Sequence, residues 1–325
     1  MRETSSRIVF RVAAGPRIGF GHLMRARALA RALGVRPVVS VRGGATARRT
    51  AERIGCVVLP PDVSPFSMAR LLVVDDPSAI QARAWVERAR RQRVPCVGVQ
   101  DAGAADCGAD LVVDGGVCAT PTGSQRRLEG SRYCLLDTRD APKTPGSNRR
   151  PNRVLIALGG GAHVRRAARR LATAVAERCP SADIVVASGF VRTPLPKLPR
   201  GRWITRSSGL TSEFTTSSVA VVAGGQTMYE ACSLGVPAVS VAVVGAQRRA
   251  IEACSAVGAI VDAGGPDMSP ATAARVAGGV ARLLASRQLR TRVSKRARDL
   301  VDGRGADRVA RRITRLMRAW ETAHV

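Results

Sequence analysis

The sequence of 325 residues is poor in aromatic side chains, in histidine and in lysine, and each shortage excludes a class of protein. Aromatic residues make up 3% of the chain, so it has no run of basic and aromatic residues of the kind that stacks nucleic-acid bases. The eight cysteines include no C-x-x-C pair, and the three histidines are too scattered for a zinc site of ordinary spacing. We therefore expect no specific nucleic-acid partner, no bound metal and no cofactor.

The sequence also lacks a long apolar run. The longest nearly apolar stretch, 236–246, is well short of the roughly 20 residues that a helix needs to cross a bilayer. Near the N-terminus, Glu3, Arg7 and Arg11 interrupt any segment that would resemble a secretion signal. We therefore expect a cytoplasmic protein without a transmembrane segment. Nothing in the sequence indicates its oligomeric state.

What the sequence has in excess is positive charge. Its formal net charge is +28, from 52 lysines and arginines against 24 aspartates and glutamates, and only three of the basic residues are lysine. A basic surface binds polyanions by releasing their counterions, so nonspecific adhesion at low salt is expected. The arginines, however, are spread over the whole chain among alanine, glycine and valine. This distribution is typical of GC-rich codon usage and does not indicate a nucleic-acid interface.

Short runs of β-branched residues alternate with alanine- and arginine-rich helical patterns along the whole chain. This alternation predicts an α/β protein in which helices cover both faces of parallel sheets. The polar stretch 139–152, which contains proline and glycine and has no periodicity, predicts a linker. We expect one Rossmann-like domain over 1–138 and a second over 153–325 that ends in basic helices broken near 303–305. Ligands of such folds bind at the carboxyl ends of the strands, which predicts a site in a cleft between the domains.

A glycine motif follows the first predicted strand. Gly19 and Gly21 precede a helix in which His22 is among the first residues, and Arg25 lies about one turn further. Glycine lets the backbone come close to a ligand, and the start of a helix carries free N–H groups that suit an anion. Histidine is the side chain used most often as a general base, so His22 is the candidate for that role. The alternative is that His22 only caps the helix or lies on the surface.

A second glycine turn opens the second half of the chain. Gly160 and Gly161 belong to a run of three glycines between a predicted strand and a predicted helix. Backbone N–H groups in such a turn bind anions, and a plain connection between strand and helix is the alternative. His163 follows this turn and is expected to be a capping or exposed residue.

A third motif ends a strand with Gly224 and Gly225 and starts a helix with Gln226 and Thr227. Glu230 lies one turn into this helix, on the same face as the two residues that start it. A carboxylate at this place accepts hydrogen bonds from the two hydroxyls of a ribose, and the helix start suits the attached diphosphate. An exposed helical glutamate without a ligand is the alternative.

Other polar residues lie at the ends of predicted elements. Asp75 and Asp76 end one strand of the first domain, and Asp101 follows another. Adjacent carboxylates on a strand point to opposite faces, which argues against a metal shared by Asp75 and Asp76. We expect these carboxylates to contact a sugar or to cap a neighbouring element instead. Gln247, at the start of a helix in the second half, is a candidate donor to a sugar hydroxyl, with a purely structural role as the alternative.

The segments GFGHLMRARALA and AGGQTMYEACSLGVPAVSV, together with the triple-glycine turn, resemble the nucleotide-sugar enzymes of the GT-B fold that include MurG. They are still more similar to the PseG-type UDP-sugar hydrolases of pseudaminic acid biosynthesis. The resemblance implies a UDP-sugar held by the second domain, with Glu230 on the ribose and His22 over the anomeric carbon. Water would attack that carbon and release UDP. Transfer of the sugar to an acceptor, and binding without turnover, are the alternatives.

The chain departs from the pattern of these hydrolases at three positions. Ala13 and Ala162 stand where the family has acidic residues, and Asp137 stands where it has arginine. Two acidic groups that would contact the sugar are therefore absent. The resemblance thus constrains the fold more than the identity of the sugar, and a different sugar or a loss of activity are both open.

Overall fold

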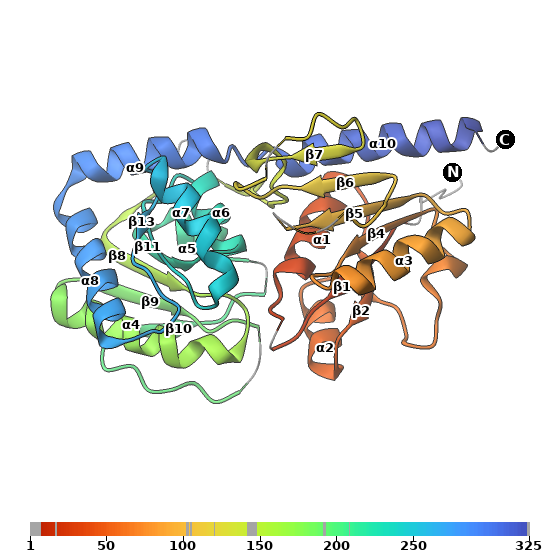
Figure 1. The fold of residues 1–325 in the computed structure, drawn as a ribbon. Coiled ribbons are helices and arrows are strands. Elements are labelled where there is room, and N and C mark those ends of the chain that lie inside the picture. Colours follow the sequence, from red (N-terminus) through yellow and green to blue (C-terminus); the bar gives the residue numbers. More distant parts are fainter. Residues whose placement is uncertain are drawn as a thin grey trace. The chain divides into compact units, whose positions relative to one another are not determined.

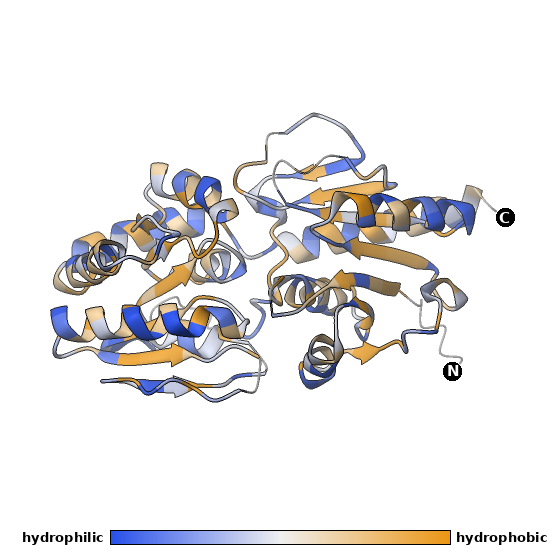
Figure 2. Ribbon diagram, turned by 60° about the horizontal axis from the view of Figure 1, so that its bottom comes forward, coloured by the Kyte–Doolittle hydropathy of each residue, from blue (hydrophilic) through white to orange (hydrophobic). Residues whose placement is uncertain are grey.

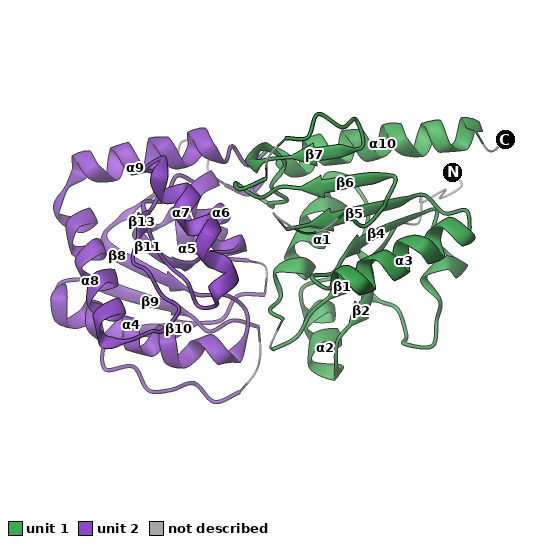
Figure 3. Cartoon of the chain, in the orientation of Figure 1, with its two compact units in different colours: residues 1–137, 304–325 green, residues 138–303 purple. Residues whose placement is uncertain are grey.

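The alternation of strands and helices gives two α/β units, which are coloured separately in Figure 3. The computed structural model describes residues 8–16, 18–101, 104, 106–119, 121–141, 148–190, 193–207 and 209–323. Unit 1 comprises 1–137 with 304–325, and unit 2 comprises 138–303. The chain thus passes from one unit to the other twice. Next to both crossings, Thr138 Oγ1 donates to the carbonyl of Gly303 at 3.1 Å.

Unit 1 is built on a sheet of seven parallel strands (Figure 1). Side by side these are β3 (Val57–Val58), β2 (Val38–Arg42), β1 (Ile8–Ala13), β4 (Leu71–Asp75), β5 (Cys96–Gln100), β6 (Leu111–Asp114) and β7 (Arg127–Glu129). Strands β1, β4 and β5 are buried almost throughout and rich in valine or leucine, as expected for parallel strands covered on both faces. The β-branched runs of the sequence predict strands at 7–12, 37–41, 56–59, 71–74, 96–99 and 110–113. Every strand of this sheet is thus predicted except β7, whose residues RLE contain no apolar run.

The helices of unit 1 are α1 (Gly21–Ala32), α2 (Ala45–Arg53), α3 (Ala79–Arg91) and α10 (Gly305–Ala323), with short 3-10 turns η1 (Pro65–Ser67) and η2 (Ser131–Tyr133). Helix α10 packs against α1 and η2 and buries Val309, Ala310 and Ile313. The assignment of 304–325 to the second domain is therefore wrong. The apolar face of α10 packs against unit 1, and sequence periodicity alone does not reveal which unit a helix packs against.

Unit 2 is built on a sheet of six parallel strands, in the order β10 (Arg202–Ile204), β9 (Asp183–Ala187), β8 (Arg150–Ala157), β11 (Ser217–Ala223), β12 (Ala238–Val241) and β13 (Val261–Asp262). Its helices are α4 (Arg165–Arg178), α5 (Thr211–Thr215), α6 (Gln226–Ser233), α7 (Arg248–Ala256), α8 (Pro270–Ala285) and α9 (Arg287–Leu300), with 3-10 turns η3 (Ala162–Val164) and η4 (Gly245–Gln247). The break between α9 and α10 falls where the sequence predicts it.

Strand β8 begins within the predicted linker. Arg150 is the register partner of Ser217 of β11, and a shift in register separates this pair from the regular pairing that starts at Val219. Residues 150–152 of the predicted linker therefore extend β8, and residues 142–147 of that linker lie outside the described residues. The short elements β10, β13 and α5 were not expected from the sequence, because each is too brief to show a period.

Both sheets reverse their chain order at one place. In unit 1, β1 and β4 are neighbours and the chain runs outwards from them in both directions, and in unit 2 the same holds for β8 and β11. Ligands of open α/β sheets bind at the carboxyl ends of the strands at this point. The segments that follow β1, β4, β8 and β11 are therefore the first places to look for a site.

Apolar side chains are concentrated in the strands of both units, which are coloured orange in Figure 2. Helix α10 shows one apolar and one polar side, as expected for a helix that packs on one face only. Within the described ranges, no helix combines the length and the apolar character needed to span a bilayer.

Candidate functional site

The chain turns tightly between β1 and α1. Gly15 and Gly19 exchange two backbone hydrogen bonds of 3.0 and 2.7 Å, and Gly19 has a φ of +93°, which favours glycine. Helix α1 then begins at Gly21 with no side chain capping it. The side chain of the N-cap residue Phe20 thus satisfies none of the N–H groups of the first turn, and anion binding by the glycine motif stays a prediction.

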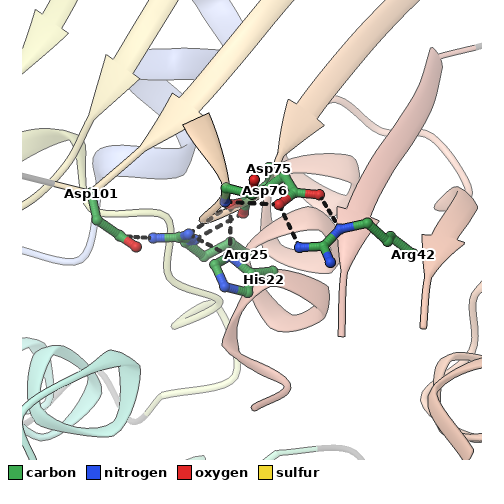
Figure 4. A network of polar contacts seen from close by, with 7 residues as sticks. His22, Arg25, Arg42, Asp75, Asp76 and Asp101 are labelled. Atoms are coloured by element: carbon green, nitrogen blue, oxygen red, sulfur yellow. Dashed lines mark hydrogen bonds and ion pairs between the residues drawn. The ribbon is translucent and has the colours of Figure 1, made fainter. Parts of the chain in front are cut away.

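His22, the second residue of α1, is paired with Asp75, the last residue of β4 (Figure 4). Nδ1 of His22 lies 2.8 Å from Oδ1 of Asp75, and the two residues are 8% and 2% exposed. When Nδ1 donates its proton to the carboxylate, Nε2 is the basic nitrogen of the ring. Nε2 makes no hydrogen bond to any described residue. A buried carboxylate that orients a histidine in this way is the arrangement found in general-base catalysis.

Arg25 holds the pair in place from the next turn of α1. Its Nε and Nη2 donate to the two oxygens of Asp75 at 2.9 and 2.6 Å, and its Nη1 donates to Asp101 at 2.5 Å. Nη2 of Arg25 lies 2.7 Å from Nδ1 of His22, and both nitrogens are within hydrogen-bonding distance of the same oxygen of Asp75. These contacts make Arg25 a positioning residue for Asp75, while direct contact with a UDP-sugar, for which its place one turn after the glycine motif makes Arg25 a candidate, stays a prediction.

The charges of this network determine the ionised state of Asp75. Burial opposes its charge, but the Arg25 guanidinium and His22 outweigh burial, so the pKa of Asp75 lies below its ordinary value. Burial also opposes the charge of Arg25, while Asp75 and Asp101 raise the pKa of Arg25 above its ordinary value. At neutral pH, Asp75 is therefore a carboxylate that accepts the Nδ1 proton.

Replacing Asp75 by asparagine is expected to lower the free energy of unfolding by about 3 kcal/mol at pH 7, because buried Arg25 then loses its buried counter-charge and keeps only the exposed carboxylate of Asp101. The lowered pKa sets the pH dependence. Stabilisation by Asp75 is complete above the ordinary carboxyl range, near pH 4, and is lost as the pH falls through the lower pKa of the folded state. Urea denaturation of the parent and of the Asp75→Asn variant, at neutral and at acidic pH, measures the difference in the free energy of unfolding. A difference between them that does not shrink in acid would contradict the assignment.

Asp76 points away from this network. Nε and Nη2 of Arg42 donate to its two oxygens at 2.6 and 2.7 Å, and the backbone N–H of Ser78 donates at 2.9 Å. Adjacent strand residues thus hold different partners, as the alternation of side chains predicts. No three potential metal ligands gather anywhere in the part of the chain that is described.

Two of the three departures from the hydrolase pattern have structural explanations. Ala13 is fully buried and is the register partner of Arg42. Asp137 accepts from Nη1 of Arg31 with both oxygens at 3.0 Å, so its carboxylate pairs with the last turn of α1. Ala162 begins the 3-10 turn η3, and nothing in the structure explains the alanine there.

In unit 2, the triple-glycine turn follows β8. The carbonyl of Gly160 accepts from the N–H of Phe190 at 2.9 Å, and Gly161 precedes the 3-10 turn that leads into α4. Arg165, 5% exposed, donates to the carbonyls of Ser188 and Thr193, which fixes the neighbouring loop beside this turn. His163 is exposed, as the sequence predicts. The predicted anion-binding role of Gly160 and Gly161 stays a prediction.

Replacing Gly189 by alanine is expected to lower the free energy of unfolding by about 1–3 kcal/mol and to displace the triple-glycine turn. Gly189 has a φ of +75°, and a Cβ there would lie 2.5 Å from the carbonyl oxygen of Gly160. Urea denaturation gives the loss. Gly278→Ala is the matched control, because this helical glycine has open space around it and alanine favours helices. Equal stability of the Gly189 and Gly278 variants would contradict the expectation.

The third glycine motif lies on the strand next to β8. Ala157 of β8 and Val222 of β11 are register partners, so the turn at Gly224 and Gly225 starts beside the triple-glycine turn. A Cβ at Gly224 would lie 2.5 Å from Ile251, which explains the glycine. Gln226 and Thr227 begin α6, with no side chain capping its start, and half-buried Glu230 lies one turn further.

The amide of Gln247 has a fixed orientation next to this turn. Its Oε1 accepts from the N–H of Val243 at 2.8 Å, so Nε2 is the end that remains to donate. Nε2 lies 3.7 Å from the place where a Cβ of Gly225 would be. The structure thus brings Gln247 together with Gly225. The contact between Gln247 and a sugar hydroxyl stays a prediction. The cleft between the domains also stays a prediction.

No protein-family model matches the chain. The chain is 30% identical over 119 residues to the spore coat polysaccharide biosynthesis protein SpsG of Bacillus subtilis strain 168, which is 37% of this chain. The match spans about a third (34%) of the length of that relative.

Solved structures that are similar over nearly the whole chain include the following two. MurG of Acinetobacter baumannii has a TM-score of 0.61 and 15% identity, covering 95% of this chain and 99% of MurG. The glycosyltransferase SsfS6 of Streptomyces sp. SF2575, complexed with thymidine diphosphate, has a TM-score of 0.56 and 16% identity, covering 95% and 100%. These similarities confirm the predicted GT-B fold, and the finer resemblance to PseG-type hydrolases stays a prediction.

Proposed function

We propose that this protein is an enzyme that cleaves the bond between a nucleoside diphosphate and the anomeric carbon of a sugar, and transfers the sugar to a hydroxyl group of an acceptor. The observation that carries the proposal is the buried His22–Asp75 pair at the switch point of the first sheet. The GT-B fold, which glycosyltransferases such as SsfS6 share, supports a nucleotide sugar as the substrate. The partial similarity to SpsG supports a role in polysaccharide biosynthesis.

In this mechanism His22 is the general base. Nε2 takes the proton of the acceptor hydroxyl while that oxygen attacks the anomeric carbon and the bond to the diphosphate breaks. The carboxylate of Asp75, which accepts from Nδ1, stabilises the imidazolium that forms. A diphosphate leaves without strong protonation, so donors that hold its charge are sufficient on the leaving side.

The second unit holds the nucleotide in this proposal. The uncapped start of α6 and the turns at Gly160–Gly161 and Gly224–Gly225 supply backbone N–H groups for the diphosphate. Glu230 accepts from the ribose hydroxyls, and Nε2 of Gln247 donates to the sugar. The nucleotide is a uridine diphosphate, and the thymidine diphosphate bound to SsfS6 supports a pyrimidine nucleotide.

Replacing Glu230 by glutamine is expected to weaken the binding of UDP about 10-fold, by a loss of roughly 1.4 kcal/mol from charge-assisted hydrogen bonds to the ribose. The effect on 2′-deoxy-UDP should be clearly smaller, because that ligand lacks one of the two hydroxyls. Calorimetric titration with both nucleotides measures the change. Equal weakening of both ligands would contradict the ribose contact.

Hydrolysis is the second candidate function, and the observation that favours it is the similarity of the GFGH and GGQT segments to the PseG-type UDP-sugar hydrolases. Chemically, water takes the place of the acceptor hydroxyl and His22 deprotonates it. Both candidates share the same base and the same leaving group. They differ only in the nucleophile that the site admits.

Incubation with a panel of UDP-sugars, including UDP-amino sugars, tests both candidates. Release of UDP that requires an added acceptor supports transfer, whereas stoichiometric release of UDP and free sugar without an acceptor supports hydrolysis. Binding of UDP without turnover of any member of the panel would contradict both candidates and leave a binding protein.

A further inference from the structure

A second group of charged residues lies on the other face of the first sheet, beyond the His22 network. It consists of Arg11 on β1, Arg42 at the end of β2, Arg88 and Trp85 on α3, and Asp76 after β4, and we call it the Arg11 cluster. Arg11 is the register partner of Ser40, and Arg42 stands two residues further on the same strand. The side chains of Arg11 and Arg42 therefore lie on the same face, near its carboxyl edge.

The contacts of Arg11 leave most of its hydrogen-bonding capacity unused. Nη1 donates to the hydroxyl of Ser40 at 3.0 Å, and the guanidinium lies over the ring of Trp85, 4.6 Å from its centre. Nε is buried and without a partner, and Nη2 makes no hydrogen bond within the described ranges. A buried donor without a partner is rare and costly, so the buried Nε requires an explanation, and Nη2 remains available to donate to water or to a ligand.

The cluster also has too little negative charge. Asp76 is its one carboxylate among the described residues, and both oxygens are occupied by Arg42. Arg88 lies over the same Trp85 ring, 5.0 Å from its centre, which adds a third guanidinium. Burial lowers the pKa of Arg11, Asp76 raises it, and the charges of Arg42 and Arg88 lower it further. Ala13, beside Arg42 in the register, contributes no carboxylate.

We propose that Arg11 and Arg42 form a subsite that binds an oxyanion, a carboxylate or a phosphate, carried by the sugar or by the acceptor that unit 1 handles. The unused Nη2 of Arg11 and Nη1 of Arg42 are the donors, and guanidinium groups match carboxylate and phosphate geometry. Asp75 and Asp76 are consecutive residues, the last of β4 and the one that follows it. Asp75 is hydrogen-bonded to His22 and Asp76 to Arg42, so the base and the subsite contact the same strand end. The link to sugar or acceptor rests on the proposed function, whereas the anion site itself does not.

Trp85 offers a local readout of this subsite, because Arg11 and Arg88 both lie over its ring. In a chain with Trp203 and Trp320 replaced by phenylalanine, titration with inorganic phosphate at constant ionic strength should change Trp85 emission in a saturable way. Arg11→Gln and Arg42→Gln should each weaken this binding at least 10-fold. Arg91→Gln, which removes an exposed arginine paired with Glu87 on the same helix, is the matched control and should bind as the parent does.

A response that does not saturate, or that is equal in all variants, would overturn the subsite. Arg42 is at the strand end with its side chain 33% exposed, so its variant keeps the test valid if the Arg11 variant fails to fold. Two pairs of ligands identify the source of the anion: UDP-glucuronic acid against UDP-glucose, and glucose 6-phosphate against glucose. If the anionic ligand of a pair binds more tightly than its neutral partner, and the Arg11→Gln variant loses that difference, the pair identifies the source of the anion. If neither pair shows a difference, the link between the subsite and the substrate is overturned.

This design separates the two proposals. Phosphate binding at Trp85 without turnover of any UDP-sugar would refute the proposed function alone. Turnover without phosphate binding at Trp85 would refute the subsite alone.

Discussion

Replacing His22 by alanine is expected to lower kcat about 10²- to 10⁴-fold, the usual contribution of a positioned general base. His22 is hydrogen-bonded to Asp75 through Nδ1, which leaves Nε2 to take the proton, and alanine leaves the attacking oxygen with its proton. The affinity for UDP should change little, because the proposed nucleotide contacts come from unit 2. Steady-state kinetics with the sugar found in the UDP-sugar panel, and calorimetric titration with UDP, measure the two quantities.

The matched control is His163→Ala, because His163 is exposed and lies beside the triple-glycine turn of unit 2. This variant should keep the turnover of the parent. A His22→Ala protein that turns over as fast as the parent would remove the base from the mechanism. A loss of UDP affinity equal to the loss of turnover would instead indicate a binding role for His22.

Replacing Asp75 by asparagine is expected to lower kcat by up to about 10⁴-fold, as loss of the orienting carboxylate does in catalytic triads. Asparagine offers no charge to stabilise the imidazolium, and its amide can donate to Nδ1, which moves the proton to Nε2. The ring then presents a donor where the reaction needs an acceptor. Kinetics must be measured at a temperature where the variant is folded, because the same change is expected to destabilise the protein.

Asp101→Asn is the control for this prediction. The side chain of Asp101 is 64% exposed, and among the described residues its carboxylate is hydrogen-bonded to Arg25 alone, so its charge supports the network from the solvent side. A small loss of turnover is expected. If the Asp101 and Asp75 variants lost the same activity, the network would act through Arg25 and not through the His22–Asp75 pair.

Sequence patterns were sufficient for the strands and helices that are long or strongly apolar. Strands such as β4 and β8 contain continuous apolar runs, at 71–74 and 154–157, and parallel strands buried on both faces have that composition for a physical reason. The two-residue strand β13 and the polar start of β8 depend on neighbours that pair with them. Helix α10 is visible as an amphipathic helix, but its partner α1 lies almost 300 residues away in the chain.

The candidate site was predictable in its parts and not in its pairing. The position of His22 after a glycine turn indicates a base, and Asp75 at the end of a buried strand indicates a functional carboxylate. Their contact follows from β1 and β4 being neighbours, and strand order is a property of the folded sheet. The Arg11 cluster is invisible in the sequence for the same reason, since its members come from four separate segments of the chain.

The central claim is that His22 and Asp75 act as one unit on the substrate, and a double-mutant comparison tests it most directly. Turnover of the His22→Ala/Asp75→Asn protein is to be measured beside the two single variants. We predict that the double variant is no slower than His22→Ala alone, because Asp75 has nothing to orient once the imidazole is gone. Losses that multiply in the double variant would show that the two residues act independently and would contradict the mechanism.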